Sequence, residues 1–490
     1  MAHGETSTAD RVVVAVFDGL RPDMVTAELT PNILRLAARG TWFREARSVF
    51  PSLTRVATTS IATGAPPTFH GIVGNAFLHA AAIPECIFDT SRAELIYRAE
   101  AHHNGRLVGV DTFGDMLARV GRRLAVVHTG SAGSAHFINP RARDNGHWTF
   151  SMHGANSTQT PHAFAEALER IGPLPEREMP RLGELRYAAR LMTEHVLPVL
   201  APDVALVWFN EPDTTFHYKG IGSPAAAAGL QEADKAFGAI LDWVEAQPDA
   251  ERIAVIAASD HGQISTGALH PLFDEARQAG FGIASSSDFA DAAFIATGGI
   301  SGEIRLRNGD RKALSRLAAW LMEQPHVGHV FTPARNEVEG QVDGTLSLGL
   351  IGNGHERQPE LMFILRSDLT ADPFGLPGLG GMTPGDVPLG GGMHGGINPH
   401  ELNTVLILSA ATAEPQRGLS SAPAGIIDIA PTVLGLLGLP PAPSMQGRNL
   451  AQPPRNEPQR SRHSAGNGAF TQHVDLVEQD GRRFILGGGH

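Results

Sequence analysis

The feature that most constrains the fold is an apolar run near the amino terminus, RVVVAVF at residues 11–17, which stops abruptly at Asp18-Gly19. The run is rich in β-branched residues and too short to cross a membrane, so it predicts a strand that is buried on both faces, as in a parallel sheet. Asp18 would then lie at the carboxyl end of that strand. In open α/β sheets, ligands bind along this edge.

Two later apolar runs repeat this arrangement. VALVWFN at 204–210 leads into EPDTTFHYKG, and RIAVIAA at 252–258 leads into Ser259-Asp260-His261-Gly262. Helical patterns alternate with these runs, including an alanine-rich segment at 224–246. The alternation predicts the α/β class: a doubly wound, mostly parallel central sheet flanked by helices, with a site along one edge.

The pattern loosens over residues 271–385, where strand-like and helix-like segments stand among many glycines and prolines. We expect an inserted, smaller α+β cap subdomain here, which divides the catalytic core into residues 11–270 and 386–450. Residues 140–175 are polar and His-rich and predict a surface excursion. Residues 451–490 predict a polar C-terminal tail, poorly ordered over 452–467 because little of it can be buried.

Composition excludes some classes of partner. The formal net charge is −12 and only three lysines are present, which argues against a nucleic acid polymer or an anionic membrane surface as partner. A small phosphorylated substrate stays compatible with this charge, because bound divalent ions would dominate the local field. The single cysteine, Cys86, and a polar amino terminus without an apolar core predict a cytoplasmic protein.

Carboxylates, imidazoles and one hydroxyl recur just after strand-like runs or in glycine-rich loops. Carboxylate and imidazole groups suit a divalent transition metal such as zinc, and this set is too large for one tetrahedral ion but suits two. The candidate metal ligands are Asp18, Thr54, Asp213, His217, Asp260, His261 and His394.

Thr54 follows Pro51-Ser52-Leu53 and precedes a run that can be helical as far as Thr63. Its hydroxyl would stand at a helix amino terminus, where negative charge is favoured. A threonine hydroxyl needs a metal ion to become a nucleophile at neutral pH, and Asn75 could donate a hydrogen bond to a phosphoryl oxygen. Asp213 and His217 are four residues apart, so they share a face only if their segment is helical.

Seven motifs, in this order along the chain, resemble those of the alkaline phosphatase superfamily. Within it, they are most similar to the type I phosphodiesterase / nucleotide pyrophosphatase family. The motifs are DGLRPD at 18–23, FPSLTR at 50–55, TGxxPxxHGIxGN at 63–75, PDxxxH at 212–217, SDHG at 259–262, MHGG at 393–396 and IIDIAPT at 426–432.

The resemblance implies a phosphoric ester hydrolase that uses two zinc ions and a covalent phosphothreonine intermediate. It implies that Asp213, His217 and His394 hold one ion, and that Asp18, Asp260 and His261 hold the other together with the nucleophile Thr54. Asn75 would bind the phosphoryl oxygen. Manganese or iron could also occupy such a site.

One departure from the family concerns the substrate. An aromatic residue often follows the nucleophile in nucleotide pyrophosphatases, where it stacks on the base, whereas this chain has Arg55. An arginine there favours a substrate with a second anionic group, so Arg55 is a predicted substrate-binding residue. A phosphomonoesterase or a phosphonate (C–P) hydrolase of the same superfamily is the alternative. The turn TGSAGSA at 129–135 lacks the substrate-binding lysines of phosphonoacetate hydrolases.

Overall fold

The computed structural model describes residues 8–285, 289, 292–307, 309–410 and 417–490. Its centre is an eight-stranded sheet in the order β21-β2-β20-β9-β1-β8-β6-β7. Only β20 runs against the other strands, so the sheet is mostly parallel, as predicted. The strands are β1 Arg11–Phe17, β2 Thr41–Phe43, β6 Leu124–His128, β7 Trp148–Ser151, β8 Val204–Phe209, β9 Ile253–Ala258, β20 Leu406–Ser409 and β21 Gly418–Ser420.

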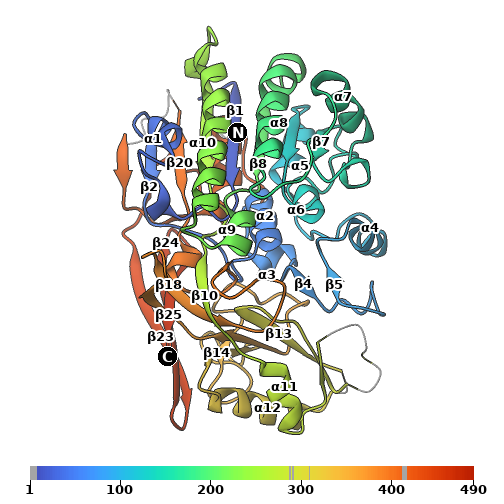
Figure 1. Cartoon of the computed structure of the whole chain (residues 1–490), viewed down its shortest axis with the longest axis vertical. Coiled ribbons are helices and arrows are strands. Elements are labelled where there is room, and N and C mark those ends of the chain that lie inside the picture. The colour runs from blue at the N-terminus through green and yellow to red at the C-terminus, as the bar shows by residue number, and fades with distance from the viewer. Residues whose placement is uncertain (1–7, 286–288, 290–291, 308, 411–416) are drawn as a thin grey trace.

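Helices cover both faces of this sheet (Figure 1). Alternate residues of β1 point into two different cores: Val13 packs with helices α1, α7, α8 and α10, and Val14 packs with α2, α5 and α14. Burial on both faces explains why the run has no polar residue between Val12 and Phe17. These helices span Pro31–Ala37 (α1), Thr54–Thr63 (α2), Phe113–Arg119 (α5), Pro161–Ile171 (α7), Leu182–Leu191 (α8), Pro224–Glu245 (α10) and Ile429–Leu436 (α14).

A second unit occupies the lower part of Figure 1. It contains a six-stranded sheet, β11-β12-β13-β16-β14-β15, whose strands lie between residues 283 and 365, with α11 (Leu272–Gln278) and α12 (Arg311–Glu323) packed on it. The strands are β11 Ile283–Ala284, β12 Phe294–Ala296, β13 Ser301–Leu306, β14 Val327–Thr332, β15 Leu346–Ser347 and β16 Leu361–Leu365. The domain limits at 271 and 385 stay a prediction.

A four-stranded sheet joins the second unit to the central sheet. In it, β10 (Ile264–Leu269) pairs with β18 (Pro377–Met382) and with β19 (Gly392–Met393), and β17 (Ser367–Ala371) pairs with β18. The pairing of Ser265 with Gly392 places the chain that leaves the core beside the chain that returns to it. This brings His394 close to Asp260-His261.

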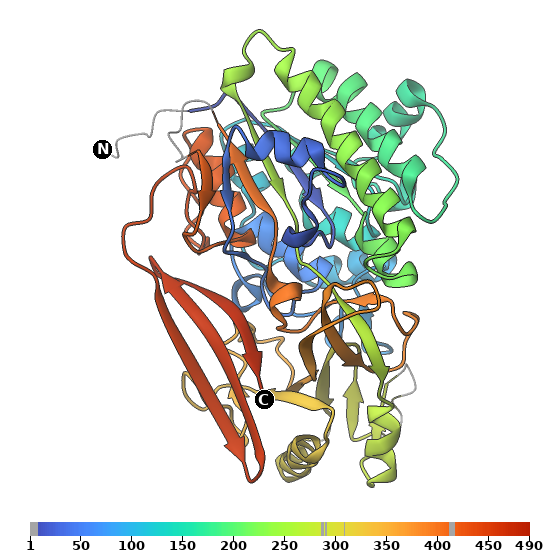
Figure 2. The same ribbon diagram turned by 60° about the vertical axis from the view of Figure 1, so that its left-hand side comes forward.

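The expectation of a poorly ordered tail over 452–467 was wrong. β23 (Gln459–Asn467), β24 (Phe470–Gln479) and β25 (Arg482–Gly489) form a three-stranded antiparallel sheet that runs along the side of the molecule (Figure 2). β23 is a polar, exposed outer strand, whereas alternate residues of β24, such as Val474 and Leu476, are buried. The sequence prediction relied on the polar composition of the segment as a whole, which does not reveal this alternation of buried and exposed residues.

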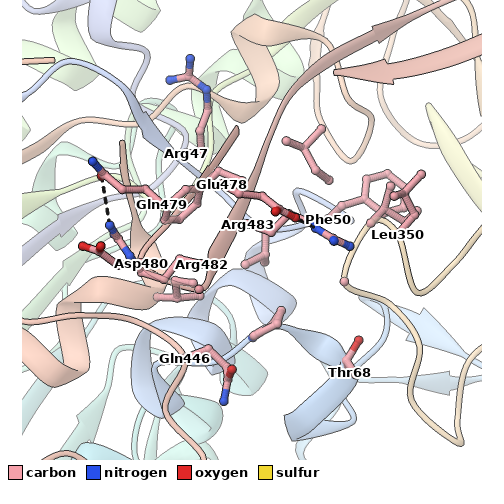
Figure 3. Close-up of a pocket in the computed structure, with 18 of the residues that line it drawn as sticks. Arg47, Phe50, Thr68, Leu350, Gln446, Glu478, Gln479, Asp480, Arg482 and Arg483 are labelled. Atoms are coloured by element: carbon pink, nitrogen blue, oxygen red, sulfur yellow. Dashed lines mark hydrogen bonds and ion pairs between the residues drawn. The ribbon is translucent and has the colours of Figure 1, made fainter. Parts of the chain in front are cut away.

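A buried ion pair joins the C-terminal sheet to the core. Arg482 donates a hydrogen bond from Nη1 to Oδ2 of Asp428 (2.9 Å), and both side chains are fully buried. A cavity of about 480 Å³ lies beside this contact, between the C-terminal sheet and the segment that contains Phe50. Figure 3 shows Arg482 directed toward Gln479 and the neighbouring Arg483 directed toward Glu478.

The segment 140–175 is also more regular than a surface excursion. β7 is the edge strand of the central sheet and pairs with β6, and α7 packs on β7 and α8. Trp148 and Phe150 supply the apolar side chains that bury this strand. In the described part of the chain, no helix is both long enough and apolar enough to cross a membrane.

Candidate active site

Three carboxylates meet because three adjacent parallel strands end side by side. Asp18 follows β1, Asp213 lies just beyond β8, and Asp260 follows β9. Gly19 adopts φ +72°, and a side chain there would contact Asp213 at 3.0 Å, so glycine allows the tight turn. The N–H of Gly19 donates to Oδ1 of Asp260 (3.0 Å), which ties the ends of β1 and β9 together.

The segment containing Asp213 and His217 is helical, which is what the two side chains need in order to share a face. Helix α9 spans Asp213–Lys219, so the two side chains lie on one face, with Nε2 of His217 3.2 Å from Oδ1 of Asp213. Nδ1 of His217 donates to the carbonyl oxygen of Gly392 (2.6 Å). That bond leaves Nε2 free to act as a ligand.

His394 approaches the same carboxylate from the loop after β19. Its Nε2 lies 3.5 Å from Oδ1 of Asp213, and its ring stacks on that of His261 with 3.6 Å between centroids. Nδ1 of His394 donates to the carbonyl oxygen of Ser52 (2.7 Å). The peptide two residues before Thr54 therefore orients this imidazole.

Thr54 is the first residue of α2, and its side chain is buried. Its Oγ1 lies 3.2 Å from Nε2 of His261. Nδ1 of His261 donates to the carbonyl oxygen of Gly262 (3.1 Å), and Nε2 also lies 3.2 Å from Oδ2 of Asp260 and 3.5 Å from Oδ1 of Asp18. The hydroxyl predicted as nucleophile is thus adjacent to the predicted ligands.

Asn75 lies beside the amino terminus of α2. Its Oδ1 accepts a hydrogen bond from the backbone N–H of Arg55 (3.0 Å), and both residues line a cavity. An amide held in this way can donate to an oxygen of a bound phosphoryl group.

The residues fit divalent metal ions. In the described part of the chain, two buried groups have ligand atoms within 4.8 Å of one another: Asp213, His261 and His394, and Asp18, Asp260 and His261. Within the described residues, Oδ1 of Asp18 and Oδ2 of Asp260 are buried and form no hydrogen bond, and their one nearby polar contact is Nε2 of His261 at 3.5 and 3.2 Å; such burial is costly unless a cation binds there. His217 contacts Asp213 but stands outside the first group, so an ion shared by His217 and His394 stays a prediction.

The electrostatics of these groups also suit a cation. Burial, reinforced by the carboxylates of Asp260 and Asp213, raises the pKa of Asp18 well above its usual range. Burial lowers the pKa of His394 well below its usual range, and the nearby His261 adds to this effect. Burial favours the neutral form of Asp213, but His217 and His394 outweigh it and lower the pKa of Asp213.

Three supporting residues were not singled out as site residues from the sequence. Nε1 of Trp208 donates to Oδ2 of Asp18 (2.9 Å), and Nε2 of Gln263 donates to Oδ1 of Asp213. Ser52 accepts from the N–H of Gly395 (3.1 Å) and donates to the carbonyl oxygen of Gly396 (3.0 Å). Ser52 and Gln263 lie within or next to the motifs, which was the available signal, whereas Trp208 looked like an ordinary core residue.

Two cavities open onto the candidate ligands. The core cavity, of about 300 Å³, lies within the large α/β unit and is lined by Arg55, Thr129, Ser131, Arg181 and Glu184 together with ligand residues. The insertion cavity, of about 440 Å³, lies toward the second unit and is lined by Val73, Phe273, Glu303, Met382 and Asp386, among others. Asn75, His217, Tyr218 and His394 line both.

Known proteins share this fold. Two structures of murine ectonucleotide pyrophosphatase / phosphodiesterase 5 superpose on the chain. One, an inactive variant in complex with AMP, has a TM-score of 0.57 and 15% identity over 89% of this chain and 96% of that one. The other has a TM-score of 0.58 and 14% identity over 88% of this chain and 96% of that one. At 14–15% identity, the similarity to these two structures shows that the fold is shared and no more.

Sequence comparison identifies the family of this chain. An uncharacterized pyrophosphatase/phosphodiesterase of Schizosaccharomyces pombe is 25% identical over 267 residues, which are 52% of this chain and 45% of the yeast protein. The chain thus spans less than half the length of that relative. The sequence model of type I phosphodiesterase / nucleotide pyrophosphatase matches residues 12–363. The chain belongs to the type I phosphodiesterase / nucleotide pyrophosphatase family.

Proposed function

We propose that this protein hydrolyses phosphoric diesters through a covalent phosphothreonine intermediate on Thr54, with two divalent metal ions, most simply zinc. The observation that carries the proposal is the place of the Thr54 hydroxyl: it lies at the start of α2, 3.2 Å from a histidine shared by both candidate ligand groups. The proposed ligands are Asp213, His217 and His394 for one ion, and Asp18, Asp260, His261 and Thr54 for the other.

The reaction takes two displacements. Oγ1 of Thr54 attacks phosphorus and the bond from phosphorus to the leaving alcohol breaks, so that the alcohol departs with the proton from the hydroxyl. Water then attacks the phosphothreonine, the bond from Oγ1 to phosphorus breaks, and a proton returns to Oγ1. The products are an alcohol and a phosphate monoester. When bound, the ions would lower the pKa of the hydroxyl and the water and offset charge on the phosphoryl oxygens.

Residues of the chain orient the phosphoryl group in both steps. Asn75 donates from its amide nitrogen to a non-bridging oxygen, because its carbonyl oxygen is already engaged by the N–H of Arg55. The first N–H groups of α2 add positive potential behind Thr54. Both features act where negative charge gathers in the transition state.

The substrate is proposed to be a small phosphorylated molecule. AMP bound to the murine relative makes a nucleotide-sized ligand reasonable. The two cavities, of about 300 and 440 Å³, can each accept one arm of such a molecule. Large polymers are not proposed, since the chain carries a formal net charge of −12.

The test is to quench the metal-loaded enzyme with acid during turnover and measure its mass. We expect a phosphorylated species that maps to Thr54 and is absent from Thr54→Ala, while elemental analysis still finds both ions in that variant. Undiminished hydrolysis by Thr54→Ala would overturn the proposal. A diester, a monoester and a phosphonate assayed side by side distinguish a phosphodiesterase from a monoesterase or a C–P hydrolase.

A further inference from the structure

The two cavities that meet at the candidate active site differ in charge. Two arginines, Arg55 and Arg181, line the core cavity. Among the described residues that line the insertion cavity there is no lysine or arginine, whereas Glu303 and Asp386 are both present. One arm of a substrate would therefore lie near arginine side chains, and the other arm would not.

Arg55 has a cationic group with few partners in the protein. Its Nε donates to Oγ1 of Thr90 (3.3 Å), and within the described part of the chain its two Nη atoms have neither a hydrogen-bond partner nor a carboxylate in ion-pair contact. The side chain is half-buried and lines the core cavity. A guanidinium removed from water in this way is stabilised when an anion binds to it.

The neighbours of Arg55 hold it in this position. Helix α6 (Ala132–Phe137) packs against α2, and a side chain added at Gly133 would lie 1.7 Å from the carbonyl oxygen of Thr90 and 3.3 Å from Cγ of Arg55. The close approach of α6 at Gly133 therefore lets its backbone lie against the aliphatic part of the Arg55 side chain.

Arg181 is differently placed. Its Nη1 donates to Oε1 of Glu184 (3.1 Å), so its charge is offset within the protein. The acids of the insertion cavity also have partners: Glu303 pairs with Arg305 (2.8 Å), and Asp386 accepts from the hydroxyl of Tyr218 (3.0 Å). Of the two arginines that line the core cavity among the described residues, Arg55 is the one without a carboxylate in ion-pair contact, although the charges of Asp89, Asp18 and Asp213 act on it from farther away.

We propose that the substrate carries a second anionic group, a carboxylate or a phosphate, on the arm that enters the core cavity, and that Arg55 binds this group. The other arm, in the insertion cavity, is neutral or cationic. This inference rests on the proposed function, because it assumes that the phosphoryl group bound beside Thr54 is the one attacked. It specifies the substrate as an asymmetric ester that bears an anion one to a few bonds from the scissile phosphorus.

The experiment compares three 4-nitrophenyl phosphodiesters on the metal-loaded enzyme: the methyl ester, the carboxymethyl ester and the 2-phosphonooxyethyl ester. The leaving group is the same in all three, so the second arm alone differs. We expect kcat/KM for at least one anionic arm to exceed that for the methyl ester by tenfold or more, and the better of the two distinguishes carboxylate from phosphate.

Variants assign the preference to a residue. Arg55→Met should bring the ratio of anionic to methyl ester to within about twofold of unity, and Arg55→Lys should keep part of the preference. Arg181→Met is the matched control, because it removes a cation of the same cavity that already has an acidic partner; its ratio should change less than threefold.

A second readout does not depend on turnover of the anionic ester. Phosphoglycolate, the product of the carboxymethyl ester, should inhibit methyl ester hydrolysis more strongly than methyl phosphate, and Arg55→Met should abolish that difference. Equal rates on all three esters, or an unchanged ratio in Arg55→Met, would overturn the inference and leave the diesterase standing. If Arg181→Met lowered the ratio of anionic to methyl ester kcat/KM as much as Arg55→Met does, the assignment to Arg55 would be overturned. Failure to hydrolyse any ester would remove the proposed function and this inference with it.

Discussion

The hydroxyl oxygen of Thr54 and Nε2 of His261 lie 3.2 Å apart, although 207 residues separate them in sequence. The contact joins the start of α2 to the end of β9, the two places where the motifs predict a nucleophile and a metal ligand. Without a metal ion it is a hydrogen-bond distance. With one, both atoms are free to bind it, because Nδ1 of His261 is already engaged by Gly262.

The first prediction concerns the hydroxyl itself. Thr54→Ser keeps an oxygen at the same position and should retain activity within about tenfold, whereas Thr54→Ala should lose about 1,000-fold or more in kcat. Both variants are assayed on one diester with the metal content measured in parallel. Comparable losses in the two variants would show that the methyl group, rather than the oxygen, is what matters at this position.

A second prediction concerns the amide of Asn75. Asn75→Asp keeps the acceptor for the N–H of Arg55 but replaces the donor with a negative charge, so it should lower kcat at least as much as Asn75→Ala, by roughly 100- to 1,000-fold. Thermal midpoints of the two variants identify any loss due to folding. If Asn75→Asp were as active as wild type, the amide would have no role in binding the phosphoryl oxygen.

A third prediction compares two neighbouring arginines of β25. Arg482→Met leaves Asp428 buried without its ion-pair partner and should cost roughly 3–5 kcal/mol of unfolding free energy. Arg483→Met breaks solvated pairs with Glu337 and Glu478 and should cost less than about 1 kcal/mol. Urea denaturation of both variants provides the measurement. Similar losses would contradict the view that the buried pair stabilises the C-terminal sheet more than the solvated pairs do.

A fourth prediction concerns pH. Burial lowers the pKa of His329 to about 4, against a usual value near 6.5, so below pH 6.5 the unfolded chain binds a proton that the folded chain excludes. Stability is therefore lost as pH falls from 6.5 toward 4. Between pH 7 and pH 5 this one group should account for about 2 kcal/mol of the loss.

His329→Gln tests this prediction, because it removes the titrating group from β14 while keeping a polar side chain. The variant is expected to be less stable at pH 7 but to lose about 2 kcal/mol less than wild type between pH 7 and pH 5. Unfolding free energies at both pH values give the comparison. Parallel pH profiles for the two proteins would exclude His329 as a source of the acid sensitivity.

A fifth prediction concerns metal removal. The carboxylates of Asp18, Asp213 and Asp260 lie close together and are buried. Removal of the metal ions with a chelator should leave their negative charges without a nearby cation and lower the thermal midpoint of unfolding. An ion present at ~1,000 times its Kd contributes about 4 kcal/mol, or about 4 °C for a chain of this length. Scanning calorimetry before and after chelation, and after zinc is restored, measures the effect. A midpoint indifferent to metal would argue that no ion binds there.

The buried strands and their terminal acids were predictable from the sequence because their signals are local. β1, β8 and β9 are continuous apolar runs, because both faces of a central parallel strand are buried and polar side chains are disfavoured on either face. The positions of Asp18 and Asp260 followed from where those runs stop. The helical spacing of Asp213 and His217 was left open by the sequence and is confirmed by α9.

Other features depend on contacts that no local pattern records. The C-terminal sheet was missed because β23 is polar and gains its order only by pairing with β24. The support that Trp208 gives Asp18 was missed because a tryptophan in an apolar run has the same appearance whether or not its N–H has a partner. The charge difference between the two cavities required side chains from both units to be placed together.

The bond from His394 to the carbonyl oxygen of Ser52 has a consequence for activation by metal. The same short peptide contains Thr54, the proposed nucleophile, and orients the ring of His394, a proposed ligand, so an ion bound by His394 would also restrain the position of Thr54. The rate of hydrolysis should therefore rise with metal concentration more steeply than simple saturation, because the proposed ions would act on the same segment of the chain.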